Sequence, residues 1–128
     1  MINLMIVEDN KIVRDSLVTF FNMEKDIRIV AEMDDGATAL KKLRTGTKID
    51  IVLVDWNMPH MSGGLELTNF IANEFPSIKI IILTMHGKQD YKEKAKAAGA
   101  RGYILKDGEF DELVAAIRRV FFGEEVFT

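Results

Sequence analysis

The apolar run of residues 51–54, which ends abruptly at Asp55, constrains the fold of this chain more than any other stretch. An unbroken run of β-branched residues and leucine, too short for a helix and soon followed by Pro59, predicts a strand that is buried on both faces. Asp55 then lies at the carboxyl end of a strand. Ligands bind at this edge of an open parallel sheet, because the loops that leave the strands diverge there and form a crevice.

Strand-like and helix-like patterns alternate along the rest of the chain. Besides the segment that ends at Asp55, short apolar segments predict strands at residues 2–7, 27–32, 78–84 and 102–106. Apolar residues recur at helical spacing between and after them, in stretches 13–21, 37–43, 67–75, 88–98 and 110–121. This alternation predicts right-handed crossovers and a parallel sheet that is covered by helices on both faces.

The predicted helices differ in the apolar surface that they offer to a core. The first is expected to turn inward Val13, Leu17, Phe20 and Phe21, and the third Leu67, Phe70, Ile71 and Phe75. The fourth has only Tyr91, Ala95 and Ala98 on its inner face, so we expect it to pack loosely. Gly99 is placed to cap its carboxyl end.

Composition excludes several classes of protein. A length of 128 residues suits one domain, and the absence of cysteine removes disulfides and thiolate-rich metal sites, which fits a reducing cytoplasm. The start of the chain has no cationic segment or cleavage site, and its longest apolar runs are too short to span a membrane, so we expect a soluble, unexported protein. The net charge of −3 argues against direct binding to nucleic acid.

Polar side chains end four of the predicted strands: Glu8 and Asp9, then Asp55, Thr84 and Lys106. In a parallel sheet these ends meet at one edge, where three carboxylates repel one another unless a positive group compensates. Oxygen ligands suit Mg²⁺, whereas the absence of cysteine and of a histidine at a strand end makes zinc a poor candidate.

With Mg²⁺ held by Asp9 and Asp55, the free Asp55 oxygen becomes a nucleophile for a phosphoryl group and forms an acyl phosphate. Lys106 would neutralise the transferred group, and Thr84 could donate a hydrogen bond to it. Simpler interpretations exist for each residue alone: an exposed Lys106–Asp107 ion pair, a strand-ending threonine, and an acidic helix N-terminus at residues 8–10. The convergence of all these residues on one edge favours the chemical interpretation.

Four motifs carry a resemblance to a known family: Val7-Glu8-Asp9, Val54-Asp55-Trp56-Asn57-Met58-Pro59, Leu83-Thr84-Met85 and Lys106. They resemble the receiver domain of a bacterial two-component response regulator. The resemblance covers residues 1 to about 123, and residues 124–128 are expected to begin a linker or tail, with no output domain in this chain. It implies a flavodoxin-like (βα)5 doubly wound fold whose five-stranded parallel sheet has the order 2-1-3-4-5.

The resemblance also implies a role for each site residue. Asp55 would be the phosphoacceptor and Asp9 a direct Mg²⁺ ligand, while Glu8 would hold the metal through water and Asn57 through its backbone carbonyl. Lys106 would be the counter-charge of the phosphate. Thr84 and Tyr103 would form the switch pair, although Tyr103 could also be an ordinary edge-strand tyrosine.

The segments Leu83-Thr84-Met85-His86 and 99–107 are similar to the NarL/FixJ branch, in which a LuxR-type helix-turn-helix domain usually follows the receiver. The expected partners are a sensor histidine kinase, an output DNA-binding domain of the same protein, and a second copy of the chain after phosphorylation. No membrane partner is expected. The chain is expected to be a signalling module that catalyses only its own phosphorylation and dephosphorylation.

Three other functions are weighed against this one. A stand-alone response regulator acting by protein–protein contact would have the same site. A haloacid-dehalogenase-type phosphatase also uses a strand-end aspartate with Mg²⁺, but it needs a second acid two residues later, where this chain has Asn57. A nucleotide or flavin binder would need a phosphate loop after the first strand, and the acids at residues 8 and 9 would repel phosphate.

Overall fold

A computed structural model describes residues 1–56, 62–85 and 87–128. All strands pair in parallel in one sheet of the order β2-β1-β3-β4-β5-β6. The strands are β1 (Ile2–Val7), β2 (Ile27–Met33), β3 (Ile51–Trp56), β4 (Lys79–Thr84), β5 (Gly102–Leu105) and β6 (Val126–Phe127). The helices are α1 (Lys11–Phe21), α2 (Gly36–Arg44), α3 (Ser62–Glu74), α4 (Gln89–Ala98) and α5 (Phe110–Phe121). No helix in these ranges is long and apolar enough to cross a bilayer.

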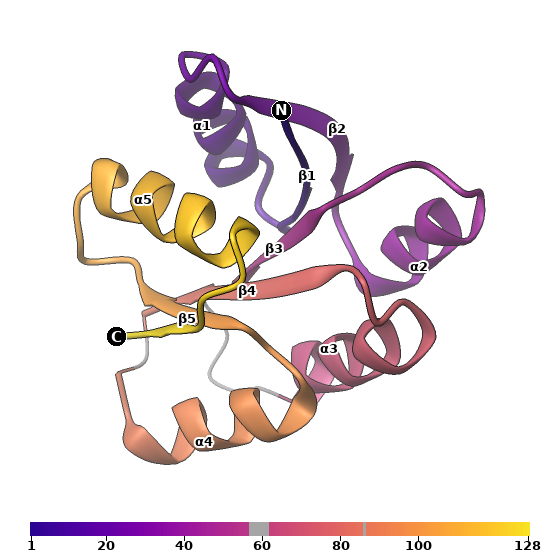
Figure 1. Cartoon of the computed structure of the whole chain (residues 1–128), viewed down its shortest axis with the longest axis vertical. Coiled ribbons are helices and arrows are strands. Elements are labelled where there is room, and N and C mark those ends of the chain that lie inside the picture. The colour runs from indigo at the N-terminus through magenta and orange to yellow at the C-terminus, as the bar shows by residue number, and fades with distance from the viewer. Residues whose placement is uncertain (57–61, 86) are drawn as a thin grey trace.

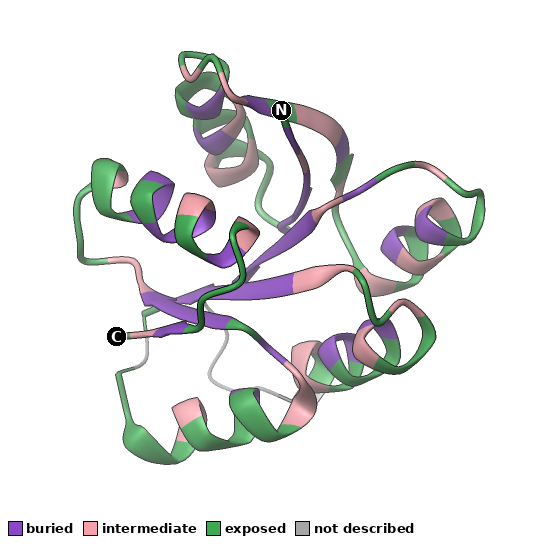
Figure 2. Cartoon of the chain, in the orientation of Figure 1, coloured by how far each residue is buried: buried purple, intermediate pink, exposed green. Residues whose placement is uncertain are grey.

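Helices cover both faces of the sheet, as Figure 1 shows: α1 and α5 lie on one side and α2, α3 and α4 on the other. Each side has its own core. Alternate residues of a strand belong to different cores, so that Leu4 and Ile6 pack with α1 and α5, whereas Met5 and Val7 pack with α2 and α3. Figure 2 shows the central strands buried between helices that are exposed on their outer sides. The doubly wound α/β class and the order 2-1-3-4-5 are therefore confirmed.

The prediction of five strands was wrong in one respect, because the sheet has a sixth strand. β6 comes from the segment that was expected to be a linker or tail. The amide of Val126 donates to the Arg101 carbonyl at 3.0 Å, and the amide of Thr128 donates to the Tyr103 carbonyl at 3.0 Å. These two carbonyls, one just before β5 and one within it, would otherwise be unpaired at the edge of the sheet, so even two residues of strand cover part of that edge.

Two aromatic side chains that were predicted to be buried are exposed. Phe20 is 48 % exposed and Phe70 is 55 % exposed. Each precedes a residue that is fully buried, Phe21 in α1 and Ile71 in α3. Successive residues of a helix point about 100° apart, so two neighbours cannot both occupy the centre of the buried face. Phe20 instead packs at the rim of the core against Phe110, with ring centroids 5.1 Å apart.

The fourth helix is held to the core mainly by one residue. Ala95 is its only fully buried side chain, while Tyr91 and Ala98 are partly exposed. The loose packing that was predicted for α4 is thus present. Gly99 ends the helix with a φ of +109°, which confirms the predicted cap.

Candidate functional site

The carboxyl ends of four strands meet at one edge of the sheet. Val7 of β1 is in register with Val54 of β3, and Asp55 is in register with Leu83, the residue before Thr84. The amide of Lys106 donates to the Thr84 carbonyl at 2.8 Å, which continues the ladder by one step beyond β5. The alignment of the parallel strands therefore brings together the polar residues that follow them.

Asp55 and Lys106 form an ion pair at this edge, between Oδ1 of the carboxylate and Nζ of the ammonium group. The Asp55 side chain is completely buried and that of Lys106 is 15 % exposed. Burial raises the pKa of Asp55, and the adjacent Lys106 acts in the opposite direction. The simpler interpretation of Lys106 as the surface partner of Asp107 does not describe this structure, because its ammonium group faces Asp55.

Glu8 lies beside Asp55 and is only 1 % exposed. The pKa of Glu8 is raised to about 8, chiefly by burial and then by the charge of Asp55 and by hydrogen bonds with the Asp9 and Asp55 carboxyl groups, while the charge of Lys106 acts to lower it. A carboxyl group in this position is not an ordinary solvated acid at the N-terminus of a helix. The N-cap of α1 is Asn10, whose side chain accepts a hydrogen bond from the amide of Val13 at 3.1 Å.

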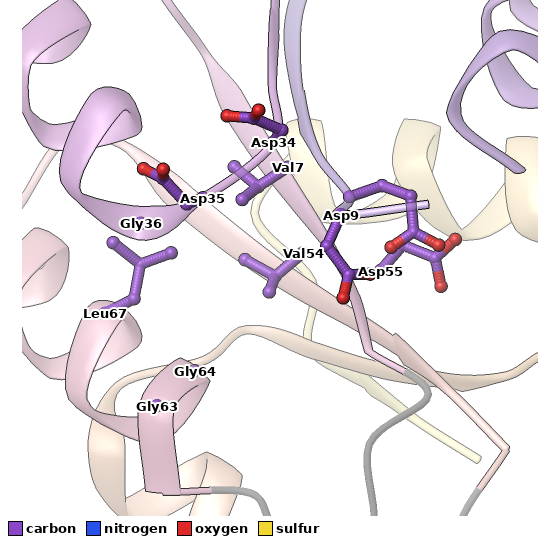
Figure 3. A pocket seen from close by; sticks show the side chains of 11 residues that line it. Val7, Asp9, Asp34, Asp35, Gly36, Val54, Asp55, Gly63, Gly64 and Leu67 are labelled. Carbon is purple, nitrogen blue, oxygen red and sulfur yellow. The ribbon is translucent and has the colours of Figure 1, made fainter. Parts of the chain in front are cut away.

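A pocket of about 270 Å³ opens beside these carboxyl groups. Figure 3 shows the Asp9 and Asp55 side chains close together on one side of it, and Asp34 and Asp35 on the other. The acidic pair at residues 34 and 35 was not among the predicted site residues. It directly follows β2, so the same rule that singled out Asp55, polar residues at strand ends, could have placed it at this edge. Asp35 also caps α2, accepting from the Thr38 amide at 2.7 Å.

The carboxylate oxygens at this pocket suit a hard divalent cation. The carboxylate oxygens of Glu8 and Asp55 are buried, and apart from Lys106 and the neighbouring carboxyl groups no described residue reaches them with a hydrogen-bond donor. Buried oxygens without donors suit Mg²⁺, which binds oxygen and retains water. As the side chains lie, residues 1–56, 62–85 and 87–128 contain no ready-made cluster of three ligating groups. Asp55 is paired with Lys106 instead.

The predicted switch residues lie in contact with each other at this edge of the sheet. Thr84 and Tyr103 are both fully buried. Burial raises the pKa of Tyr103, and a hydrogen bond with the Thr84 side chain opposes that rise. Tyr103 belongs to the core that α2, α3 and α4 cover. The structure therefore has the Tyr103 side chain turned inward, into that core.

A second pocket, of about 370 Å³, leads from Asp55 and Lys106 between α1 and the start of α5. Its walls include Ile12 and Phe20 of α1 and Phe110 of α5, and Ile12 is among the most exposed apolar residues of the described chain. Sequence reasoning missed this pocket because Phe20 had been assigned to the core. The sequence signal was nevertheless present, since Ile12, Ser16 and Phe20 recur every four residues on one helix face.

One predicted site residue lies outside the described residues. It is Asn57, which the family resemblance makes a Mg²⁺ ligand through its backbone carbonyl. Its role remains a prediction. The other predicted site residues, Glu8, Asp9, Asp55 and Lys106, lie together at the edge, and Thr84 adjoins them through the Lys106 amide.

Comparison with known proteins identifies the family of this fold and site. The family model described as the response regulator receiver domain matches residues 4–118. The chain belongs to this family, and it is therefore the receiver domain of a two-component response regulator, which is a signalling module.

Named relatives agree with the expected branch. The chain is 40 % identical over 124 residues to the response regulator UvrY of Escherichia coli (strain K12), a match that covers 97 % of this chain and 56 % of UvrY. It is 38 % identical over 121 residues to the oxygen regulatory protein NreC of Staphylococcus aureus (strain JH9), covering 94 % of this chain and 55 % of NreC. The chain thus spans just over half the length of these curated relatives.

A solved structure leads to the same branch. The two-component response regulator of the LuxR family from Aurantimonas sp. SI85-9A1 is 34 % identical, with a TM-score of 0.86, and the match covers 97 % of this chain and 87 % of that one. The predicted NarL/FixJ membership is confirmed by these similarities.

Proposed function

We propose that Asp55 accepts a phosphoryl group and that the resulting change in the receiver controls an output. The observation that carries the proposal is the buried ion pair of Asp55 with Lys106, beside the buried carboxyl group of Glu8. A completely buried carboxylate is costly unless it is paired, and its only described cation is Lys106. Such an arrangement suits a carboxylate that has to react rather than one that stabilises the fold.

In the proposed transfer, an Asp55 carboxylate oxygen attacks phosphorus. The bond from phosphorus to the donor breaks, and the donor keeps the electron pair, whether it is the imidazole nitrogen of a phosphohistidine or the carboxyl oxygen of acetyl phosphate. Lys106 favours the ionised, nucleophilic form of Asp55 before transfer and then balances the charge of the phosphoryl oxygens. Lys106 is thus needed both before and after the reaction.

The residues present also suit the Mg²⁺ that receiver domains generally use. Asp9 and Asp55 would hold it directly, Glu8 through water and Asn57 through its carbonyl. When bound, the ion supplies the positive charge that lets several carboxylates and a phosphoryl group share one edge.

The phosphoryl donor that we propose is the phosphohistidine of a sensor histidine kinase. The pocket beside α1 supports this partner, because it joins an exposed apolar wall, with Ile12 and Phe20, to the reactive pair Asp55 and Lys106. A partner helix that covers this wall would bring a side chain at its end to Asp55. As for response regulators in general, we place this meeting in the cytoplasm.

The proposed output is transcription, through a LuxR-type helix-turn-helix domain of the full-length protein. The relatives that support it are response regulators longer than this chain, and LuxR-family regulators are among the similar structures. A phosphorylation-dependent homodimer would couple the two parts. The alternative, a stand-alone regulator acting by protein contact, shares the chemistry at Asp55 and differs only in its partner. A phosphatase function is not supported by the family match.

Intact-mass spectrometry tests the chemistry. With Mg²⁺ and acetyl phosphate, we expect one phosphoryl group of about 80 Da per chain, the mass of PO₃H. Asp55→Asn should show none, because an amide cannot form the acyl phosphate. Efficient uptake by Asp55→Asn, or repeated turnover of phosphate esters by the unaltered chain, would contradict the proposal.

A further inference from the structure

Both backbone polar groups of Glu8 are hydrogen-bonded. The amide of Glu8 donates to the Met33 carbonyl of β2 at 2.9 Å, so Glu8 is still attached to the sheet. The Glu8 carbonyl accepts a hydrogen bond from the Arg14 guanidinium, with 2.7 Å between Nη1 and the oxygen. This carbonyl belongs to the same peptide plane as the amide of Asp9. Whatever fixes the carbonyl therefore fixes where the Asp9 side chain begins.

Arg14 is itself held in place for this contact. It lies on the first turns of α1, where its amide donates to the Asn10 carbonyl at 2.9 Å, and its side chain is only 16 % exposed. Its Nε lies 3.9 Å from a carboxylate oxygen of Glu32 on β2. The guanidinium thus bridges α1, the acidic turn and the edge strand, and among the described residues its only hydrogen bond is to the Glu8 carbonyl.

The contact is an unusual use of a charged side chain. Lys106, rather than Arg14, is the cation that pairs with Asp55. A partly buried arginine next to an acidic site would be expected to pair with a carboxylate, which makes stronger hydrogen bonds than a carbonyl does. Here the best geometry is with the backbone of the turn. Its effect is therefore on the conformation of the turn more than on the charge of the site.

We propose that Arg14 is a positioning residue for the cation ligand Asp9. By holding the Glu8 carbonyl, Arg14 keeps the Glu8–Asp9 peptide in the orientation that directs the Asp9 carboxylate into the pocket shared with Asp55. This inference rests on the proposed function, since it assigns a purpose to the orientation of Asp9. It adds a residue that touches neither the cation nor the phosphoryl group.

Three variants separate positioning from charge and from general stability. Arg14→Met keeps the aliphatic stem and removes every donor. Arg14→Lys keeps the charge and one donating group. Glu32→Gln is the matched control, because it removes the weak ion pair at 3.9 Å and leaves the bond to the Glu8 carbonyl. Far-ultraviolet circular dichroism and thermal unfolding without Mg²⁺ establish that each variant is folded.

The measurement is the dissociation constant for Mg²⁺, from calorimetry and from the fluorescence of Trp56, the only tryptophan of the chain and the residue after Asp55. Loss of a residue that orients a metal ligand typically weakens binding by about tenfold to 100-fold. We expect an increase of this size for Arg14→Met, a smaller one for Arg14→Lys and less than a twofold change for Glu32→Gln. The Mg²⁺ concentration for half-maximal phosphorylation should rise in parallel, with the rate at saturating Mg²⁺ nearly unchanged.

Two results would overturn the inference. One is an Arg14→Met protein that binds Mg²⁺ like the unaltered chain. The other is a loss of rate at saturating Mg²⁺ with an unchanged half-saturation concentration, which would indicate a general structural defect. If the methionine variant fails to fold, Arg14→Lys decides in the same way. Failure of the unaltered chain to bind Mg²⁺ or to phosphorylate Asp55 would instead refute the proposed function, so the two failures are distinguishable.

Discussion

At the scale of single residues, the charge of the site depends on whether its buried carboxyl groups are protonated. The pKa of Glu8 is raised from 4.5 to about 8, chiefly by burial and then by the neighbouring Asp55. The folded protein therefore binds this proton more tightly than the unfolded chain does. The resulting stabilisation is complete below pH 4.5 and is lost as the pH rises towards 8.

We predict that, without Mg²⁺, the melting temperature falls between about pH 5 and pH 8, because the folded state must release a proton that it holds favourably. In Glu8→Gln, which is neutral throughout, this part of the decline should disappear. Added Mg²⁺ should restore stability at pH 8, since it binds the ionised carboxylates. Thermal unfolding in buffers of constant ionic strength measures all three. Parallel pH profiles for the two proteins would show that Glu8 does not govern this dependence.

At the scale of elements, the connection from α4 to β5 is the most sterically constrained turn of the described chain. Gly99 has a φ of +109°, and a Cβ there would lie 2.5 Å from the Cβ of Ala72 in α3. Gly123, after α5, has a similar φ of +103° but no atom within 4 Å of its would-be Cβ. The two glycines share one backbone requirement and differ in the space around them.

We predict that Gly99→Ala lowers the free energy of unfolding by about 2–4 kcal/mol, the sum of a left-handed conformation and an overpacked contact. Gly123→Ala, which meets only the first of these costs, should lose about 1–2 kcal/mol. Denaturant unfolding compares them. Adding Ala72→Gly should recover part of the loss in the first variant and none in the second. Equal losses for both alanine variants would mean that the contact with α3 relaxes freely.

At the scale of the whole molecule, the predicted switch residue Tyr103 is connected to the C-terminal strand. The Tyr103 carbonyl accepts hydrogen bonds from the amide and the hydroxyl of Thr128, at 3.0 and 3.1 Å. Lys96 of α4 lies 3.6 Å from Glu125 and 5.4 Å from the centre of the Phe127 ring. A shift of α4 or of Tyr103 is therefore expected to disturb β6.

We predict that phosphorylation changes hydrogen exchange in α4, β5 and residues 124–128 together. Ala95 is the only fully buried residue of α4, and an element with two arrangements needs only a few kcal/mol of differential contact to shift. Exchange mass spectrometry with and without beryllofluoride measures this, and Asp55→Asn is the control. Changes confined to the loops beside Glu8 and Asp55 would show that the signal does not leave through α4.

The sequence alone determined the class of fold and the membership of the site. Apolar runs that end in polar residues place Glu8, Asp9, Asp55 and Lys106 at strand ends. Parallel pairing then aligns those ends at one edge of the sheet. These are local patterns, with a period set by backbone geometry, and they can be read without knowing what lies opposite each residue.

Only the tertiary structure decided which partner each residue takes. Phe21 rather than Phe20 is buried in the core. Lys106 pairs with Asp55 rather than with its neighbour Asp107, and the Arg14 guanidinium donates a hydrogen bond to the Glu8 carbonyl. The sixth strand exists only because β5 leaves an unpaired edge beside it. In each case the local sequence allows more than one partner. Segments that are distant in the sequence decide which of these partners the residue contacts.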